Sequence, residues 1–152
     1  MAGLRFLLSA AGHEIKQLAG YSALLDERLV PVDTLHAVAL TQKGKSGTIA
    51  ISFGTEFKDV TEVEIVTTNG TVVWGPTEVK SVAGKGGEKV EETKTFPYSS
   101  GVVAEVAAFA QGIEAGAIDA FQSPAEALKD VELIQRMLES GAGGATVQST
   151  VA

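Results

Sequence analysis

The sequence contains no cysteine, which excludes disulfide bonds, thiolate nucleophiles and cysteine-based zinc or iron–sulfur sites. Its only histidines are His13 and His36, too few for a histidine-rich metal centre. Basic residues are also scarce, because 12 lysines and arginines face 19 acidic residues and leave a formal net charge of −7. Such an acidic chain is not expected to bind nucleic acid or an anionic membrane. No apolar run approaches the roughly 20 residues of a membrane span, and we expect a cytoplasmic protein.

The residues that are present are those of a folded protein. Of the 152 residues, 45% are hydrophobic and 20% are charged, which is a globular composition with enough length for one core. In the first two thirds of the chain, apolar and polar residues alternate as they do in β-strands. The clearest predicted strand is 32–42, where His36 shares one face with Val38 and Leu40. The other predicted strands are residues 15–25, 48–54, 60–67, 72–74, 78–82 and 89–96.

Local signals predict a short N-terminal helix that ends at Gly12, a hairpin, and two helices after Gly101. Asn69-Gly70 predicts a tight turn between strands, because both central positions of such a turn need a positive φ. After Gly101 the apolar period becomes helical, and Gly116 is expected to end this first helix. The second helix starts at a capping box, Ser-Pro-Ala-Glu at 123–126. Its apolar stripe consists of Leu128, Val131, Ile134 and Leu138.

A block of strands followed by a block of helices predicts an α+β fold, an open, mostly antiparallel β-sheet with helices packed on one face. We expect a single domain over residues 1–141, with Gly141 ending the last helix. The Gly-, Ala- and Ser-rich residues 142–152 are predicted to be a disordered tail. The uncovered sheet face is too apolar to lie fully in water, so we expect it to cover a small-molecule substrate or to pair with a second copy as a homodimer.

Three stretches resemble the C-terminal domain of Gfo/Idh/MocA oxidoreductases, particularly fungal members. They are residues 32–57 (VDTLHAVALTQKGKSGTIAISFGTEF), 62–74 (EVEIVTTNGTVVW) and 101–141, where Ser-Pro-x-Glu-Ala-Leu leads into the last helix. The resemblance implies the same α+β fold, with an open sheet face that mediates dimerisation and borders the substrate site. In the family, a Rossmann domain with a Gly-rich NAD(P) fingerprint and a Glu-Lys-Pro motif precedes this region. None of these motifs has a counterpart here, so we expect no bound cofactor and no hydride transfer by this chain alone.

Four residues are candidates for acid–base chemistry. His36 lies in an apolar strand, where a neutral imidazole can act as general acid or base; the alternative is a hydrogen-bonded structural histidine. The phenol of Tyr21 can donate a proton or orient a carbonyl group. Asp33 and Glu56 are candidate acids.

Three aromatic residues are candidates for contacting a substrate. Phe53 shares a strand face with two isoleucines, and Tyr98 lies in a Pro-Tyr-Ser turn that can close over a pocket. Trp74 can stack on a ligand, although packing within the hairpin explains it as well.

These observations favour a cofactor-independent enzyme, an isomerase, cyclase or lyase of natural-product biosynthesis that holds a small organic intermediate in an apolar cavity on the open sheet face. One alternative is a non-catalytic module for protein binding or regulation. The other is the substrate-domain half of a split NAD(P)-dependent oxidoreductase.

Overall fold

The computed structural model describes residues 2–84 and 88–150, and its contacts divide the chain into two compact units. Unit 1 consists of Met1–Lys58 and Ala120–Ala152, and unit 2 is Asp59–Asp119. The single domain over residues 1–141 stays a prediction.

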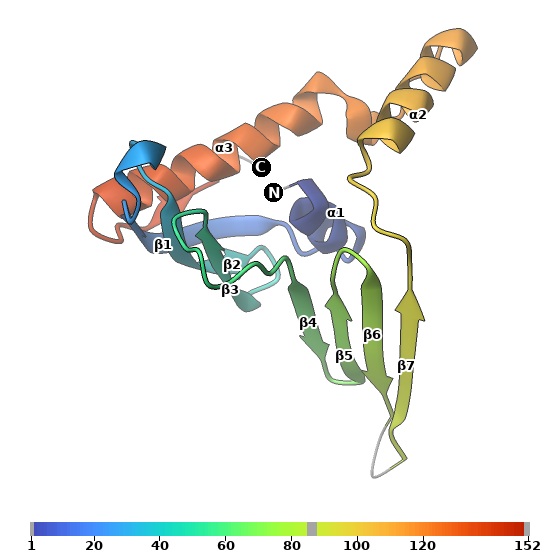
Figure 1. Ribbon diagram of the computed structural model, residues 1–152, viewed down its shortest axis with the longest axis horizontal. Helices are drawn as coiled ribbons and strands as arrows, with labels where there is room; N and C mark the ends of the chain where they lie inside the picture. The colour runs from blue at the N-terminus through green and yellow to red at the C-terminus, as the bar shows by residue number, and fades with distance from the viewer. Residues whose placement is uncertain (1, 85–87, 151–152) are drawn as a thin grey trace. The chain divides into compact units, whose positions relative to one another are not determined.

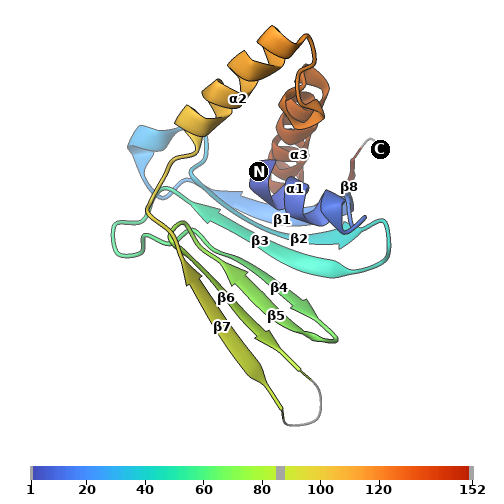
Figure 2. The ribbon, with the colours of Figure 1, turned by 90° about the vertical axis from the view of Figure 1, so that its right-hand side faces the viewer.

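Unit 1 is an antiparallel sheet with helices on one face (Figure 1). The strands are β1 (Ile15–Ala23), β2 (Thr34–Thr41), β3 (Ser46–Ser52) and β8 (Gln148–Ser149), in the order β3-β2-β1-β8. Helices α1 (Ala2–Ala10) and α3 (Pro124–Ala142) lie on the same side of this sheet (Figure 2). This arrangement confirms the predicted α+β class. The core between the layers is formed by Ile15, Leu18, Leu35, Ala37, Ala39, Leu133 and Met137.

Helix α3 buries a different face from the one its apolar stripe predicted. The buried side chains are Leu133, Met137 and Ser140, whereas the stripe from Leu128 to Leu138 is 39–67% exposed. The reason is a close approach between the helix and β1. The Ser140 hydroxyl accepts the Gly20 N–H at 2.8 Å, and a Cβ at Gly141 would collide with Ser22. Small residues therefore select the packed face, and Gly141 lies within the helix instead of ending it.

The end of the chain, predicted to be disordered, pairs with the sheet. Gln148 and Ser149 form β8 against β1, and the Thr150 N–H donates to the Lys16 carbonyl at 3.0 Å. These bonds satisfy backbone groups that an unpaired β1 edge would leave open. The last two residues, 151–152, lie outside the described residues.

Unit 2 is a four-stranded antiparallel meander followed by a helix. Strands β4 (Val63–Thr67), β5 (Gly70–Trp74), β6 (Glu78–Ala83) and β7 (Val90–Thr95) are neighbours in chain order, and helix α2 spans Val102–Ala115. The predicted stop of α2 at Gly116 is confirmed, since this residue adopts a left-handed φ of 70°. None of the described helices is long and apolar enough to span a membrane.

The hairpin turn lies one residue earlier than predicted. Thr67 pairs with Gly70, so the two turn residues are Thr68 and Asn69. Gly70 begins β5 with a φ of 154°, and a Cβ there would collide with the Val82 carbonyl. The glycine is therefore needed for a close approach to β6 and not for the second turn position.

Candidate functional site

The open face of the unit 1 sheet brings together two of the predicted site residues. Tyr21 of β1 and His36 of β2 are direct partners in the antiparallel register, and Ala50 of β3 is the next residue across. Opposite side chains in such pairs lie about 5 Å apart at their Cβ atoms. Tyr21 is 67% exposed and His36 is also exposed, so both rings are accessible from the side away from the helices.

On the side toward Leu40 the surroundings of this pair are apolar except for Thr48, which lies opposite Val38. Val38 and Leu40 follow His36 on the same face of β2, as the alternation predicted, and are 57% and 38% exposed. Ala19 lies opposite Val38, and Ala50 has no polar side chain to contribute. An imidazole and a phenol on an apolar surface can hydrogen-bond hydroxyl and carbonyl groups while the ligand's carbon skeleton contacts the valine and leucine.

Asp33 lies away from this pair and has a different partner set. It is 5% exposed, and its carboxylate accepts the N–H groups of Leu25 at 3.0 Å and Asp26 at 2.7 Å. Burial raises the pKa of Asp33, but the hydrogen bonds from the Asp26 and Leu25 N–H groups together lower it by more. The pKa of Asp33 therefore lies below its ordinary value. The carboxylate therefore holds the chain segment that follows β1.

A surface hollow of about 730 Å³ lies between the segments 25–28 and 53–57. Phe53 and Glu56, both predicted site residues, contribute to its lining, and Phe53 is 76% exposed. Asp33 connects the two walls, because its carboxylate holds residues 25–26 and its backbone carbonyl accepts the Phe53 N–H at 2.9 Å. Ligand sites commonly have volumes of roughly 300–1,000 Å³, so the hollow is large enough for a small organic molecule.

The hollow and the Tyr21–His36 pair lie at the same end of the sheet. The last row of strand partners is Ala23, Thr34 and Ser52, and the Tyr21–His36 row is two residues further in. Two residues along a strand span about 7 Å. The hollow's walls continue directly from β1 and β3, but Tyr21 and His36 are not among its lining residues, so the pair and the hollow are two neighbouring features at one end of the sheet.

The remaining predicted residues belong to unit 2. Trp74 is 40% exposed and lies between Val63 and Val79 in the strand register, and Tyr98 is 73% exposed. Their contact with a substrate stays a prediction.

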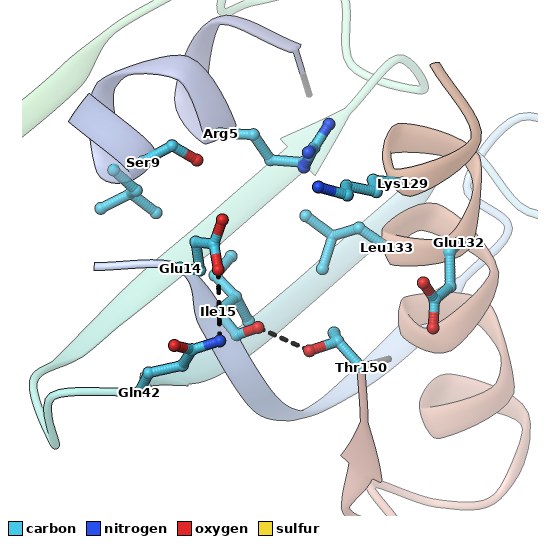
Figure 3. A pocket seen from close by; sticks show the side chains of 10 residues that line it. Arg5, Ser9, Glu14, Ile15, Gln42, Lys129, Glu132, Leu133 and Thr150 are labelled. Carbon is cyan, nitrogen blue, oxygen red and sulfur yellow. Dashed lines mark hydrogen bonds between the residues drawn. The ribbon is translucent and has the colours of Figure 1, made fainter. Parts of the chain in front are cut away.

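A second, smaller pocket was not predicted from the sequence (Figure 3). Its volume of about 50 Å³ leaves room for water but not for a substrate. Arg5 forms part of the lining and is fixed by Glu126 at 2.7 Å and Asp130 at 2.8 Å. A lone arginine in the apolar helix 2–10 was the available signal for this ion-pair network. The other lining residues include Glu14, Gln42, Lys129, Glu132 and Thr150.

Neither a three-ligand metal cluster nor a Rossmann-type glycine turn is found among the described residues. Within 2–84 and 88–150, no three histidine or acidic side chains gather as a metal site requires. Dinucleotide sites use a Gly-rich turn between a strand and a helix. The Gly-rich run 84–87, of which 85–87 lie outside the described residues, instead connects the antiparallel strands β6 and β7.

Comparison with known proteins identifies a curated relative and similar solved structures, although no protein-family profile matches the chain. Dehydrogenase FPY6 from Fusarium mangiferae is 46% identical over 143 residues, which cover 93% of this chain and 41% of that protein. An oxidoreductase from Thermotoga maritima matches 97% of this chain with a TM-score of 0.76 at 22% identity, over 40% of its own length. Levoglucosan dehydrogenase in complex with NADH and levoglucosan matches 99% of this chain with a TM-score of 0.80 at 13% identity, over 49% of its length. The chain thus spans about two fifths to one half of these proteins.

Proposed function

We infer that this chain, which has the fold of the C-terminal domain of Gfo/Idh/MocA oxidoreductases, acts as the substrate-side domain of an NAD(P)-dependent dehydrogenase. The observation that carries this proposal is the 46% identity to a fungal dehydrogenase across 93% of the chain. It favours the split-oxidoreductase alternative over the cofactor-independent isomerase or cyclase. Natural-product biosynthesis remains our expected setting for the reaction.

In this proposal another part of the dehydrogenase binds the nucleotide. The matched segment has no strand–glycine–helix fingerprint, and the similar levoglucosan dehydrogenase, which is about twice as long, was solved with NADH. The residues of this chain are therefore assigned to the substrate only.

We propose that Tyr21 and His36 contact the substrate on the open face of β1–β3. Their phenol and imidazole can hydrogen-bond a hydroxyl or carbonyl group, and Val38 and Leu40 supply apolar contacts. Phe53 and Glu56 line the neighbouring hollow, where they would contact a second part of the substrate, and Asp33 would act as a positioning residue for the walls of that hollow. A second copy covering the rest of the open face would exclude water from the bound substrate.

A domain replacement tests the proposal. The 143-residue matching segment of dehydrogenase FPY6 is exchanged for this chain, and nucleotide-dependent turnover is compared with that of intact FPY6. We expect the chimera to retain turnover. We expect His36→Ala and Tyr21→Phe to lower kcat/KM, by about 100-fold for a group that transfers a proton and less for one that only orients the substrate.

The control is Gln135→Ala, an exposed substitution on α3, which lies on the other side of the sheet, and it should leave kcat/KM near the chimera's value. A chimera that binds NADH normally but shows no turnover would contradict the proposal. Turnover of an FPY6 substrate by this chain alone, without nucleotide, would restore the isomerase or cyclase hypothesis.

A further inference from the structure

Asp33 holds both walls of the hollow at the strand end of unit 1. Its backbone carbonyl accepts the Phe53 N–H at 2.9 Å, which fixes the start of one wall. Its carboxylate accepts the N–H groups of Leu25 at 3.0 Å and Asp26 at 2.7 Å, which fixes the other wall. Because Asp33 is 5% exposed, water cannot readily replace these hydrogen bonds. The separation of the two walls therefore depends on contacts made by this one residue.

Gly54 packs directly against the same carboxylate. A Cβ at position 54 would lie 2.7 Å from the carboxyl carbon of Asp33 and 2.9 Å from the Leu25 Cβ, and it would collide with a carboxylate oxygen. The φ of Gly54 is outside the left-handed region, so the backbone conformation does not require glycine here. The glycine is required by the close packing alone. A side chain at this position would push one wall outward or break the hydrogen bonds to the other.

We propose that Gly54 is a positioning residue for the substrate, an inference that rests on the proposed function. Its missing side chain lets the wall at 53–57 contact the Asp33 carboxylate, and this contact sets the size of the substrate group that the hollow of about 730 Å³ accepts. Phe53 and Glu56, assigned to that group, lie in the same wall and would move with Gly54. Asp33, Gly54 and both walls belong to unit 1, so their contacts do not depend on where unit 2 lies.

The positioning role should affect substrate binding more than the chemical step. Tyr21 and His36, the proposed substrate contacts on the sheet, are held in register by the strand pairing of β1 with β2. A change at Gly54 moves a wall of the hollow and leaves that pairing in place. We therefore expect a higher KM with an unchanged kcat, the pattern for losing an interaction that is the same in the ground state and the transition state.

Gly54→Ala in the FPY6 chimera tests this role and should raise KM roughly tenfold. Asp33→Ala should also raise KM. The double variant should raise it no more than Asp33→Ala alone, because without the carboxylate the segment that contains Leu25 is free to make room. The matched control is Gly47→Ala on β3, where a Cβ would meet open space and φ is also outside the left-handed region. It should leave KM and kcat unchanged. Asp33→Ser, with a shorter side chain, serves if Asp33→Ala does not fold.

Amide hydrogen exchange at residues 25 and 26 in this chain alone measures the contact without a substrate. Gly54→Ala should lower their protection by about tenfold or more, and Gly47→Ala should not. Unchanged protection in Gly54→Ala would overturn the proposal, as would additive effects on KM in the double variant. Lower protection with an unchanged KM in an active chimera would overturn the positioning role and leave the proposed function standing. An unsubstituted chimera without turnover would remove the proposed function and with it the substrate role of Gly54, and the exchange result would still decide the contact.

Discussion

The two units differ in whether they bury their own apolar side chains. Unit 1 contains the seven buried hydrophobic residues that form the core between its sheet and α3. In unit 2, none of the described residues 59–84 and 88–119 is buried, although its strands and helix are as regular as those of unit 1. Val66, Val90 and Val103 are 71%, 68% and 81% exposed.

This difference shows that forming a regular element with an apolar face and burying that face within the same chain are separate properties, although one sequence pattern suggests both. An apolar face at the right period is enough to define a strand or a helix and to show which side seeks cover. It does not show whether the cover comes from the same chain. Unit 1 supplies its own cover through α3, whereas unit 2 buries none of its described residues, and we propose that other parts of a dehydrogenase cover its apolar faces.

The largest expected difference between the units is in the free energy of unfolding that is lost when one apolar side chain is removed from each. Leu18, on β1, is 1% exposed, so Leu18→Ala should lower the free energy of unfolding by about 2–5 kcal/mol through lost burial and a cavity. Phe109→Ala in α2 should change it by about 0.5 kcal/mol or less. Urea denaturation of both variants measures these values. Similar losses in the two variants would show that unit 2 has a core of its own.

A smaller difference is expected from removing one hydroxyl in each unit. Ser140 is buried, accepts the Gly20 N–H at 2.8 Å and donates to the Thr146 carbonyl at 2.7 Å. Ser140→Ala leaves these backbone groups buried without a partner, which should cost about 1–3 kcal/mol of unfolding free energy. The control is Ser99→Ala in unit 2, where an exposed hydroxyl accepts the Gly101 N–H and water can replace it. Equal small effects in thermal unfolding would contradict the structural role of Ser140.

The sequence predicted the elements of both units because their signals are local. Strand alternation gave the face of β2 that carries His36 and Val38, and glycine at 116 marked the end of α2. The resemblance to Gfo/Idh/MocA C-terminal domains is confirmed at the level of the fold. The pairing of Tyr21 with His36 depends on the register between β1 and β2, and the sequence placed both residues on strands without setting that register.

The predictions that differed from the structure involve contacts between distant segments. Gly20 and Ser140 are 120 residues apart, and their hydrogen bond selects the buried face of α3 over its apolar stripe. The Asp33 contacts are closer in sequence, seven and eight residues, but they depend on how the segment after β1 turns back, which composition and spacing do not show. The fold, and not the residue type, therefore assigns the Asp33 carboxylate a structural role as a hydrogen-bond acceptor.

The acid sensitivity of unit 1 provides a further test. Hydrogen bonds from Lys129 and then from Arg5 hold the pKa of Glu126 below its ordinary value of 4.5. A carboxyl group with a lowered folded-state pKa stabilises the fold above its unfolded pKa, and this contribution is lost as pH falls through the folded-state value. The unfolding free energy should therefore decline below about pH 4.5, and Glu126→Gln should flatten that decline. Lys129→Met should flatten it in part, and an unchanged pH profile in both variants would exclude the ion-pair network as its cause.

The smallest expected effect on stability concerns the open face of unit 1, which resembles unit 2 in lacking cover from its own helices. We propose that a second copy covers this face, and Val38, 57% exposed beside His36, lies within it. Val38→Glu should change the unfolding free energy by only about 0.5 kcal/mol, yet a buried charge at a self-complementary interface should convert dimers to monomers in sedimentation equilibrium. Ala125→Glu adds the same charge at an exposed position of α3 and should leave the dimer intact. If the unsubstituted chain sediments as a monomer, or the Val38 variant remains dimeric, the open face is left to the substrate and to the rest of the dehydrogenase.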